Sequence, residues 1–161
     1  ATTLYDVVVV NLEELAKYQQ AGKKLEITRN KVISSGPIKI DAELINAEAV
    51  IAGKKGKIKF VIKNAGTGYL INNSIPKDSL TIEIPNFEIE HNMDDIFTCS
   101  GGKCKNDKGE IRIIGKESAP LLFTLNAPSN IELWKTFTIR ATLNYTYEMR
   151  GDVSIKVIPA E

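Results

Sequence analysis

The sequence predicts an all-β protein: an immunoglobulin-like antiparallel β-sandwich that carries an N-terminal strand and one short helix. Two observations lead to this prediction. Between Pro37 and Pro159, apolar residues recur at every second position, which is the period of a strand with one face on a core and one in water. Turn residues interrupt this alternation at intervals of about 8 to 12 residues, a spacing typical of a sandwich.

The first 30 residues differ from the rest. Residues 4–10 read as a strand that is apolar on both faces apart from Asp6, and such a strand is expected to be covered on both sides. Asn11 is predicted to cap a helix, with Glu14 completing a capping box and Gly22 ending the helix. A short strand over residues 25–28 is expected to follow.

The sandwich strands follow from the alternation. In residues 57–63, Ile58, Phe60 and Ile62 point one way and the lysines between them point the other. Strands are expected near residues 38–45, 57–64, 80–84, 87–90, 110–114, 121–126, 134–147 and 153–158. The predicted buried face comprises Ile40, Ile58, Phe60, Ile62, Leu80, Ile82, Ile111, Phe123, Ile139, Leu143 and Ile155.

Composition and cysteine usage bear on the compartment and the partners. Lys plus Arg (21) nearly cancels Asp plus Glu (20), so we expect neither a nucleic-acid partner nor an anionic membrane surface. No apolar run approaches the roughly 20 residues of a membrane helix, so no membrane insertion is expected. Cys99 and Cys104 flank a Gly-Gly turn and are predicted to form a disulfide, which implies an oxidising compartment; a pair of free cytosolic thiols is the alternative. The Ala1 start fits a removed signal peptide or excision of the initiator Met.

No motif indicates catalysis. The single histidine, His91, is expected to be a polar loop residue, and no metal-ligand or phosphate-binding spacing is present. We therefore predict that the protein is not an enzyme, with no catalytic residue, no cofactor and no metal. Asn72 and Asn144 begin sequons and are candidate N-glycosylation sites. The Arg150-Gly151-Asp152 tripeptide is interpreted as a turn.

Three segments resemble a known family: residues 35–40, residues 52–69 with their Lys-Asn-Ala-Gly-Thr-Gly end, and residues 142–157 with a Tyr-x-Tyr strand. They are similar to archaeal cell-surface or secreted immunoglobulin-like domains of the S-layer-associated or adhesion-related type. The resemblance covers about residues 35–158 at the level of the fold. It implies an exported, non-catalytic role at the cell surface and gives no site.

The leading hypothesis is a secreted structural protein, a subunit of an archaeal cell-surface filament or layer whose main partners are copies of itself. Residues 1–30 form a strand-plus-helix segment and residues 31–161 the sandwich. The strand could close its own domain or pair with a neighbour's sheet edge. The candidate subunit-contact residues are Leu4, Tyr5, Val7, Val8, Val9 and Val10. The alternative is a monomeric adhesion or binding module that recognises carbohydrate or protein, such as surface glycans or other surface proteins, through the sandwich loops.

Overall fold

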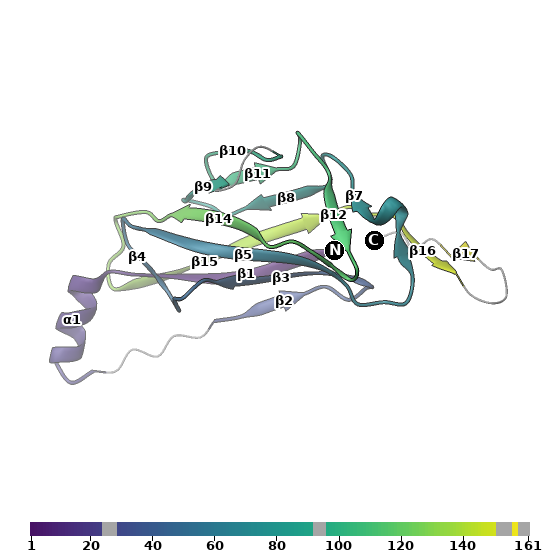
Figure 1. The fold of residues 1–161 in the computed structure, drawn as a ribbon. Coiled ribbons are helices and arrows are strands. Elements are labelled where there is room, and N and C mark those ends of the chain that lie inside the picture. The colour runs from purple at the N-terminus through teal and green to yellow at the C-terminus, as the bar shows by residue number, and fades with distance from the viewer. Residues whose placement is uncertain (24–28, 92–95, 151–155, 158–161) are drawn as a thin grey trace.

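The computed structural model describes residues 1–23, 29–91, 96–150 and 156–157. It is an all-β sandwich of antiparallel sheets with one α-helix, which confirms the predicted fold class (Figure 1). The parallel pairing of β4 with β1 is an exception among the strand pairs of the described residues. The helix α1 and the hairpin of β16 and β17 project from opposite ends of the sandwich. We call these ends the α1 pole and the hairpin pole.

The first sheet has the order β10-β11-β8-β15-β1-β2, with β4 paired to β1 beside β2. Its strand order could not be read from the alternation, because β1 at the start of the chain pairs with β15 near its end. The strands are β1 (Thr2–Val10), β2 (Lys31–Ile33), β4 (Val50–Ile51), β8 (Leu80–Glu83), β10 (Thr98–Ser100), β11 (Lys103–Lys105) and β15 (Trp134–Leu143).

The second sheet has the order β7-β12-β13-β5-β14-β9, with β3 paired to β5. Its strands are β3 (Ile38–Leu44), β5 (Lys55–Asn64), β7 (Ser74–Ile75), β9 (Glu88–His91), β12 (Ile111–Ile114), β13 (Glu117–Ser118) and β14 (Leu121–Asn126). A third, small sheet at the hairpin pole joins β6 (Tyr69–Leu70), β16 (Tyr147–Arg150) and β17 (Lys156–Val157). A 3-10 turn, η1 (Ile71–Asn73), follows β6.

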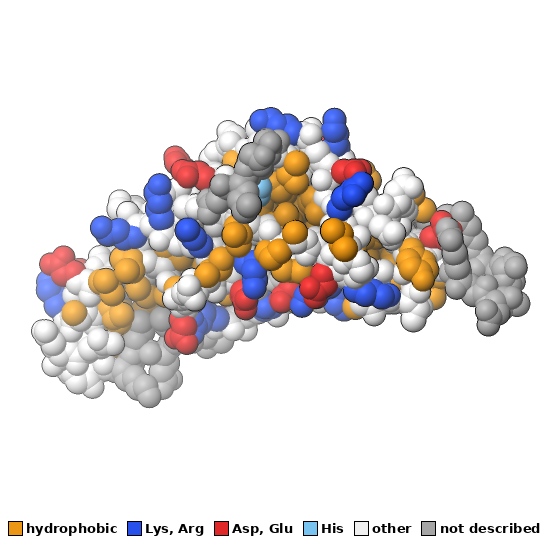
Figure 2. Space-filling view, viewed as in Figure 1, with side chains coloured by type: hydrophobic (Ala, Val, Ile, Leu, Met, Phe, Trp, Pro, Cys, Tyr) orange, Lys and Arg blue, Asp and Glu red, His pale blue; other side chains and the backbone are white. Residues whose placement is uncertain are grey.

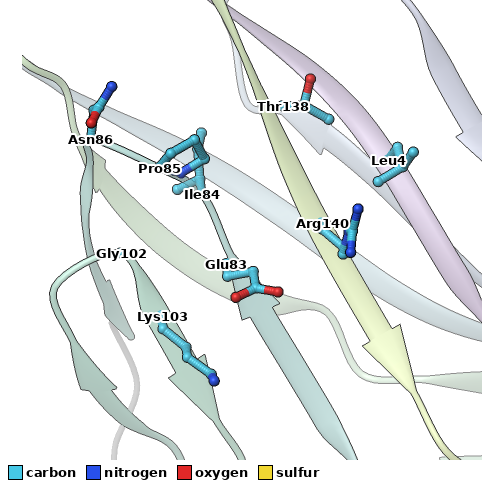
Figure 3. Close-up of a pocket in the computed structure, with 9 residues that line it drawn as sticks. All are labelled: Leu4, Glu83, Ile84, Pro85, Asn86, Gly102, Lys103, Thr138 and Arg140. Atoms are coloured by element: carbon cyan, nitrogen blue, oxygen red, sulfur yellow. The ribbon is translucent and has the colours of Figure 1, made fainter.

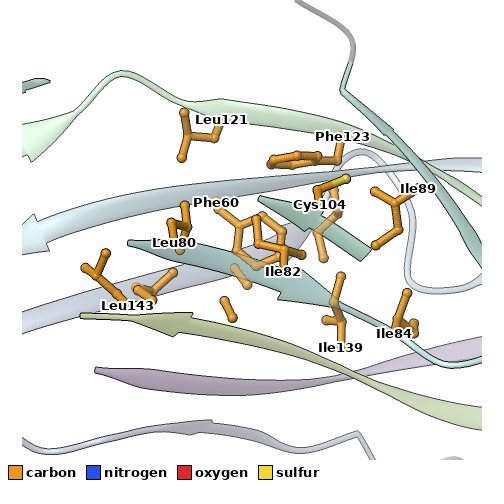
Figure 4. Close-up of a cluster of buried hydrophobic side chains, with 14 of the residues drawn as sticks. Phe60, Leu80, Ile82, Ile84, Ile89, Cys104, Leu121, Phe123, Ile139 and Leu143 are labelled. Carbon is orange, nitrogen blue, oxygen red and sulfur yellow. The ribbon is translucent and has the colours of Figure 1, made fainter. Parts of the chain in front are cut away.

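The core lies between the two large sheets (Figure 4). Phe60 from β5 and Phe123 from β14 meet edge to face, with ring centroids 5.8 Å apart. Across the core, Leu80 and Ile82 of β8 and Ile139 of β15 are fully buried. Every residue predicted for the buried face is buried except Ile155, which lies outside the described residues. The two-residue period therefore placed the strands in the correct phase.

The predicted elements are confirmed with three differences. The strand expected over residues 134–147 ends at Leu143, and the chain bends before β16 begins at Tyr147. His91 is not a loop residue, because it ends β9 and packs against Phe97 and Phe123 at ring distances of 4.7 and 4.9 Å. Strands of two or three residues, such as β4 and β6, were missed, since so short a segment shows no alternation. The strand predicted over residues 25–28 lies outside the described residues, and of the strand predicted over residues 153–158 only Lys156–Val157 is described.

The outer face of the second sheet carries opposed charges. Lys59 of β5 pairs with Glu43 of β3 at 3.0 Å, and Asp41 of β3 accepts a hydrogen bond from Lys31 of β2 at 2.8 Å. Partial burial alone would raise the pKa of Asp41, but the bond and charge of Lys31, with Lys63 and the Ala42 N–H, lower it overall. The Lys31–Asp41 pair joins the edges of the two sheets. Acidic and basic side chains also alternate along one edge of the face shown in Figure 2.

Candidate assembly site

The strand β1 lies in the first sheet between β15 and β2. It pairs with β15 along its whole length, from Thr2 opposite Thr142 to Val10 opposite Trp134. The ladder continues to the first residue, where Ala1 and Leu143 exchange two hydrogen bonds of 2.8 Å. The structure thus places all of the predicted subunit-contact residues inside their own chain's sheet.

The second half of β1 is covered on both faces, as its apolar composition predicted, whereas Leu4 is only partly buried and lines an open groove. Val7 and Val9 belong to the core between the sheets, and the Thr3 hydroxyl donates to the Ile40 carbonyl of β3 at 2.6 Å. On the opposite face Val8 and Val10 are buried as well. Because the strand brings apolar residues to both faces, losing it would expose apolar surface on two sides of the sheet.

The edge of β1 that faces away from β15 is paired only over two short stretches. The three-residue strand β2 pairs with Thr3 to Tyr5, and β4 pairs with Val9 and Val10. Between them, the Asp6 amide donates to the Asn30 carbonyl at 2.9 Å and the Asp6 carboxylate accepts from the Asn30 amide at 3.0 Å. The long ladder with β15 is therefore the main attachment of β1 to the sheet.

The connector between β1 and β2, residues 11–30, contains α1 (Leu12–Gln20). Asn11 caps this helix as predicted, because its side-chain oxygen accepts from the Glu14 amide at 3.1 Å. No residue of α1 is buried, and Leu12 keeps 53% of its surface exposed. In Figure 1 the helix stands away from both sheets. Packing of α1 against the sandwich therefore does little to hold β1 in place.

A groove of about 640 Å³ crosses the outer face of the first sheet (Figure 3). Leu4, Arg140, Glu83 and Lys103 stand opposite one another on β1, β15, β8 and β11, so they form one row across four strands. Figure 3 shows Pro85 and Asn86 beside this row, in the loop after β8. The lining of the groove combines charged side chains of both signs with the apolar residues Leu4, Ile84 and Pro85, and Leu4 belongs to β1.

A hydrogen-bonded junction at the hairpin pole was not predicted. The Tyr147 hydroxyl donates to the Asn64 side-chain oxygen at 2.9 Å and accepts from the Gly68 amide at 2.7 Å. Asn64 also bonds to the Gly66 amide and the Gly68 carbonyl. A Cβ at Gly68 would overlap the Glu148 carbonyl oxygen, so this approach requires glycine. The Lys-Asn-Ala-Gly-Thr-Gly segment and the Tyr-x-Tyr strand, noted separately in the sequence, thus contact each other.

Tyr147→Phe is expected to lower the free energy of unfolding by about 1 to 3 kcal/mol. The ring of Tyr147 is buried, so losing its hydroxyl leaves the Gly68 amide and the Asn64 oxygen each one bond short. Urea unfolding measures the change. Tyr69→Phe is the control, because Tyr69 is half exposed on the adjacent β6 and should change stability by less than about 0.5 kcal/mol. Equal stability of the two variants would contradict the role of the junction.

The structure also places the predicted disulfide and the two candidate glycosylation sites. Cys99 and Cys104 form the predicted disulfide across the β10–β11 hairpin, with Cα atoms 4.1 Å apart. Asn72 and Asn144 are both exposed, in η1 and just after β15. The interpretation of residues 150–152 as a turn extends outside the described residues.

The described residues contain neither a membrane-spanning helix nor a cluster of metal ligands. Within the described ranges, no helix is long and apolar enough to cross a membrane. Among the same residues no group of three or more His, Cys, Asp or Glu side chains could hold a metal ion. No protein-family model, curated protein or solved structure matches the chain.

Proposed function

We propose that this protein is a non-enzymatic, extracellular structural subunit that assembles with copies of itself at an archaeal cell surface, as a filament or layer, by exchanging β1. One observation carries the proposal. β1 is an inner strand of its sheet, yet it leads into a connector whose helix buries no residue. A strand held by its ladder rather than by its connector can occupy the same position in a second copy.

Exchange would keep the interactions of β1 and change only which chain supplies them. The same nine residue pairs with β15 and the same buried valines would form in a neighbour's sheet. The free energies of the closed and exchanged forms therefore differ mainly through the connector and through the surfaces that two copies bring together. Because closing each chain on itself is the competing outcome, assembly by exchange depends on protein concentration.

The connector is long enough for such an exchange. With α1 intact and its other residues extended, residues 11–30 span about 50 Å, since a helix rises about 1.5 Å and an extended chain about 3.3 Å per residue. β1 itself spans about 30 Å on the same scale. A donated β1 could therefore enter a neighbour that lies beyond either pole, and repeating this step in one direction produces a chain of subunits.

The location at the cell surface rests on the disulfide and on the family resemblance. The Cys99–Cys104 bond fits an oxidising compartment. The resemblance to archaeal cell-surface domains supplies the archaeal host and the surface role, and the near balance of charges gives no sign of a nucleic-acid partner.

A pair of engineered cysteines tests the exchange directly. Leu4 and Arg140 oppose each other on β1 and β15, so Leu4→Cys with Arg140→Cys should form a disulfide after mild oxidation. In exchanged assemblies this bond joins different chains, and a non-reducing gel should show a ladder of covalent multimers. The matched control, Lys59→Cys with Leu122→Cys, joins β5 to β14, which stay in one chain in either form. It should give monomers only.

Two results would contradict the proposal. If the assembled Leu4→Cys, Arg140→Cys protein runs as a monomer on a non-reducing gel, β1 stays in its own chain. Protein that remains monomeric at high concentration, after unfolding and refolding, would favour the alternative of a monomeric adhesion or binding module. The groove beside Glu83 and Arg140 is the observation that favours this second function, with a carbohydrate or protein ligand.

A further inference from the structure

Both glycosylation sequons lie at the hairpin pole, although 72 positions separate them in the sequence. The 3-10 turn that holds Asn72 is tied to the second sequon by a hydrogen bond of 3.4 Å from the Ile71 amide to the Thr146 carbonyl. A shared hollow of about 230 Å³ is lined by Asn72 and Ser74 of the first sequon and by Thr146 of the second. The sequence alone gave no reason to expect the two sequons to be neighbours.

Exposed apolar side chains surround the first sequon. Tyr69 and Ile71, on either side of Leu70, keep 51% and 42% of their surfaces exposed, and Met149 on the adjacent β16 keeps 41%. Tyr69 and Asn72 also line one hollow of about 610 Å³. The apolar faces of sugar rings pack against aromatic and aliphatic side chains, so an oligosaccharide at Asn72 would cover a surface that the bare chain leaves open.

We infer that Asn72 and Asn144 both carry N-linked oligosaccharides, which form one glycan cluster on the hairpin pole and cover Tyr69, Ile71 and Met149. The inference rests on the export in the proposed function, because the sugar donor is an oligosaccharide linked to a polyprenyl phosphate carrier at the outer face of a membrane. The Asn side-chain nitrogen attacks the anomeric carbon of this donor. A C–N bond forms, the C–O bond to phosphate breaks, the carrier phosphate leaves and the nitrogen loses one proton.

The two sequons differ in when they can react. The hydroxyl-bearing residue of the second sequon, Thr146, is exposed in the folded chain, as is Asn144. The corresponding residue of the first sequon, Ser74, is buried in β7. Transfer to Asn72 must therefore precede the packing of β7, whereas Asn144 stays available after folding. The folded structure accommodates both products because each Asn side chain faces solvent.

Peptide mass mapping of protein purified from its native cells tests the inference. Cleavage after Lys and Arg places each sequon in its own peptide, residues 64–77 and residues 141–150. Both peptides should be heavier by the mass of an oligosaccharide. An unmodified peptide at either position would overturn the inference. The same sample distinguishes this inference from the proposed function. An intact Cys99–Cys104 disulfide together with unmodified sequons would contradict the glycans but not export. Free thiols at both cysteines would contradict export itself.

Hydroxyl-radical footprinting tests what the sugars cover. Oxidation of Tyr69 and Met149 should rise at least twofold in an Asn72→Gln, Asn144→Gln variant relative to the native glycoprotein. Trp134, which is exposed and pairs with Val10 just before α1, is the internal control and should be oxidised equally in both. Equal oxidation of Tyr69 in the two proteins would show that the glycans do not cover this surface.

Discussion

Removing residues 1–10 is expected to cost the chain most of its stability, and a synthetic peptide of residues 1–11 is expected to restore it. Val7, Val8 and Val9 are all buried. At about 1.5 to 3 kcal/mol each, their loss removes roughly 5 kcal/mol or more, which is comparable with the whole stability of a typical domain. The peptide should rebind in the open sheet, because it brings the complete ladder with β15.

The measurements are thermal unfolding and sedimentation of the truncated chain, with and without the peptide. A peptide with Val7→Asp and Val9→Asp is the matched control and should not bind, since both side chains enter the core. Truncated chains that unfold at the original temperature would show that β1 is dispensable for the sandwich. Truncated chains that still form oligomers would rule out exchange of β1 as the means of assembly.

Phe60→Ala is expected to lower the free energy of unfolding by about 3 to 5 kcal/mol. Phe60 is fully buried, touches Phe123 edge to face and lies in the middle of β5, so its removal leaves a cavity that the sheets cannot close. Urea unfolding gives the value, provided that the slope of the unfolding free energy against urea concentration is the same in both proteins. The control is Lys59→Ala. Lys59 precedes Phe60 but lies on the solvent-facing side of β5, so this change should alter stability by no more than about 1 kcal/mol. A midpoint that Phe60→Ala leaves unchanged would mean that the phase of β5 is wrong.

Local patterns predicted most of the fold, because each of them reports on one element. The alternation around Phe60 placed β5 within two residues, and the side-chain chemistry of Asn11 and Glu14 placed the start of α1. The bend after Leu143 escaped prediction because Tyr145 and Tyr147 stay buried beyond it, so the apolar period continues through a break in the strand. An alternation cannot reveal a bend that preserves its phase.

Pairings between distant segments could not be predicted in the same way. The apolar composition of residues 4–10 predicted a strand buried on both faces but did not say which strand pairs with it, and the structure gives β15. The bonds between Tyr147, Asn64 and Gly68 also join segments far apart in the chain. The sequence showed the Lys-Asn-Ala-Gly-Thr-Gly segment and the Tyr-x-Tyr strand as two separate motifs. Only the fold shows that Gly68 and Tyr147 belong to one hydrogen-bonded junction.

The pairing of β1 with β15 determines when the sheet can be finished. Thr2 meets Thr142, so β1 can pair with β15 only after the intervening residues have been synthesised. Such distant pairing is slow, because a long loop has to close first. During that interval β1 has no β15 strand of its own chain to pair with, and a neighbouring chain that has already formed β15 would offer one. If β1 is exchanged as proposed, the local concentration of incompletely folded chains, rather than the sequence of β1, decides between a closed monomer and a linked pair.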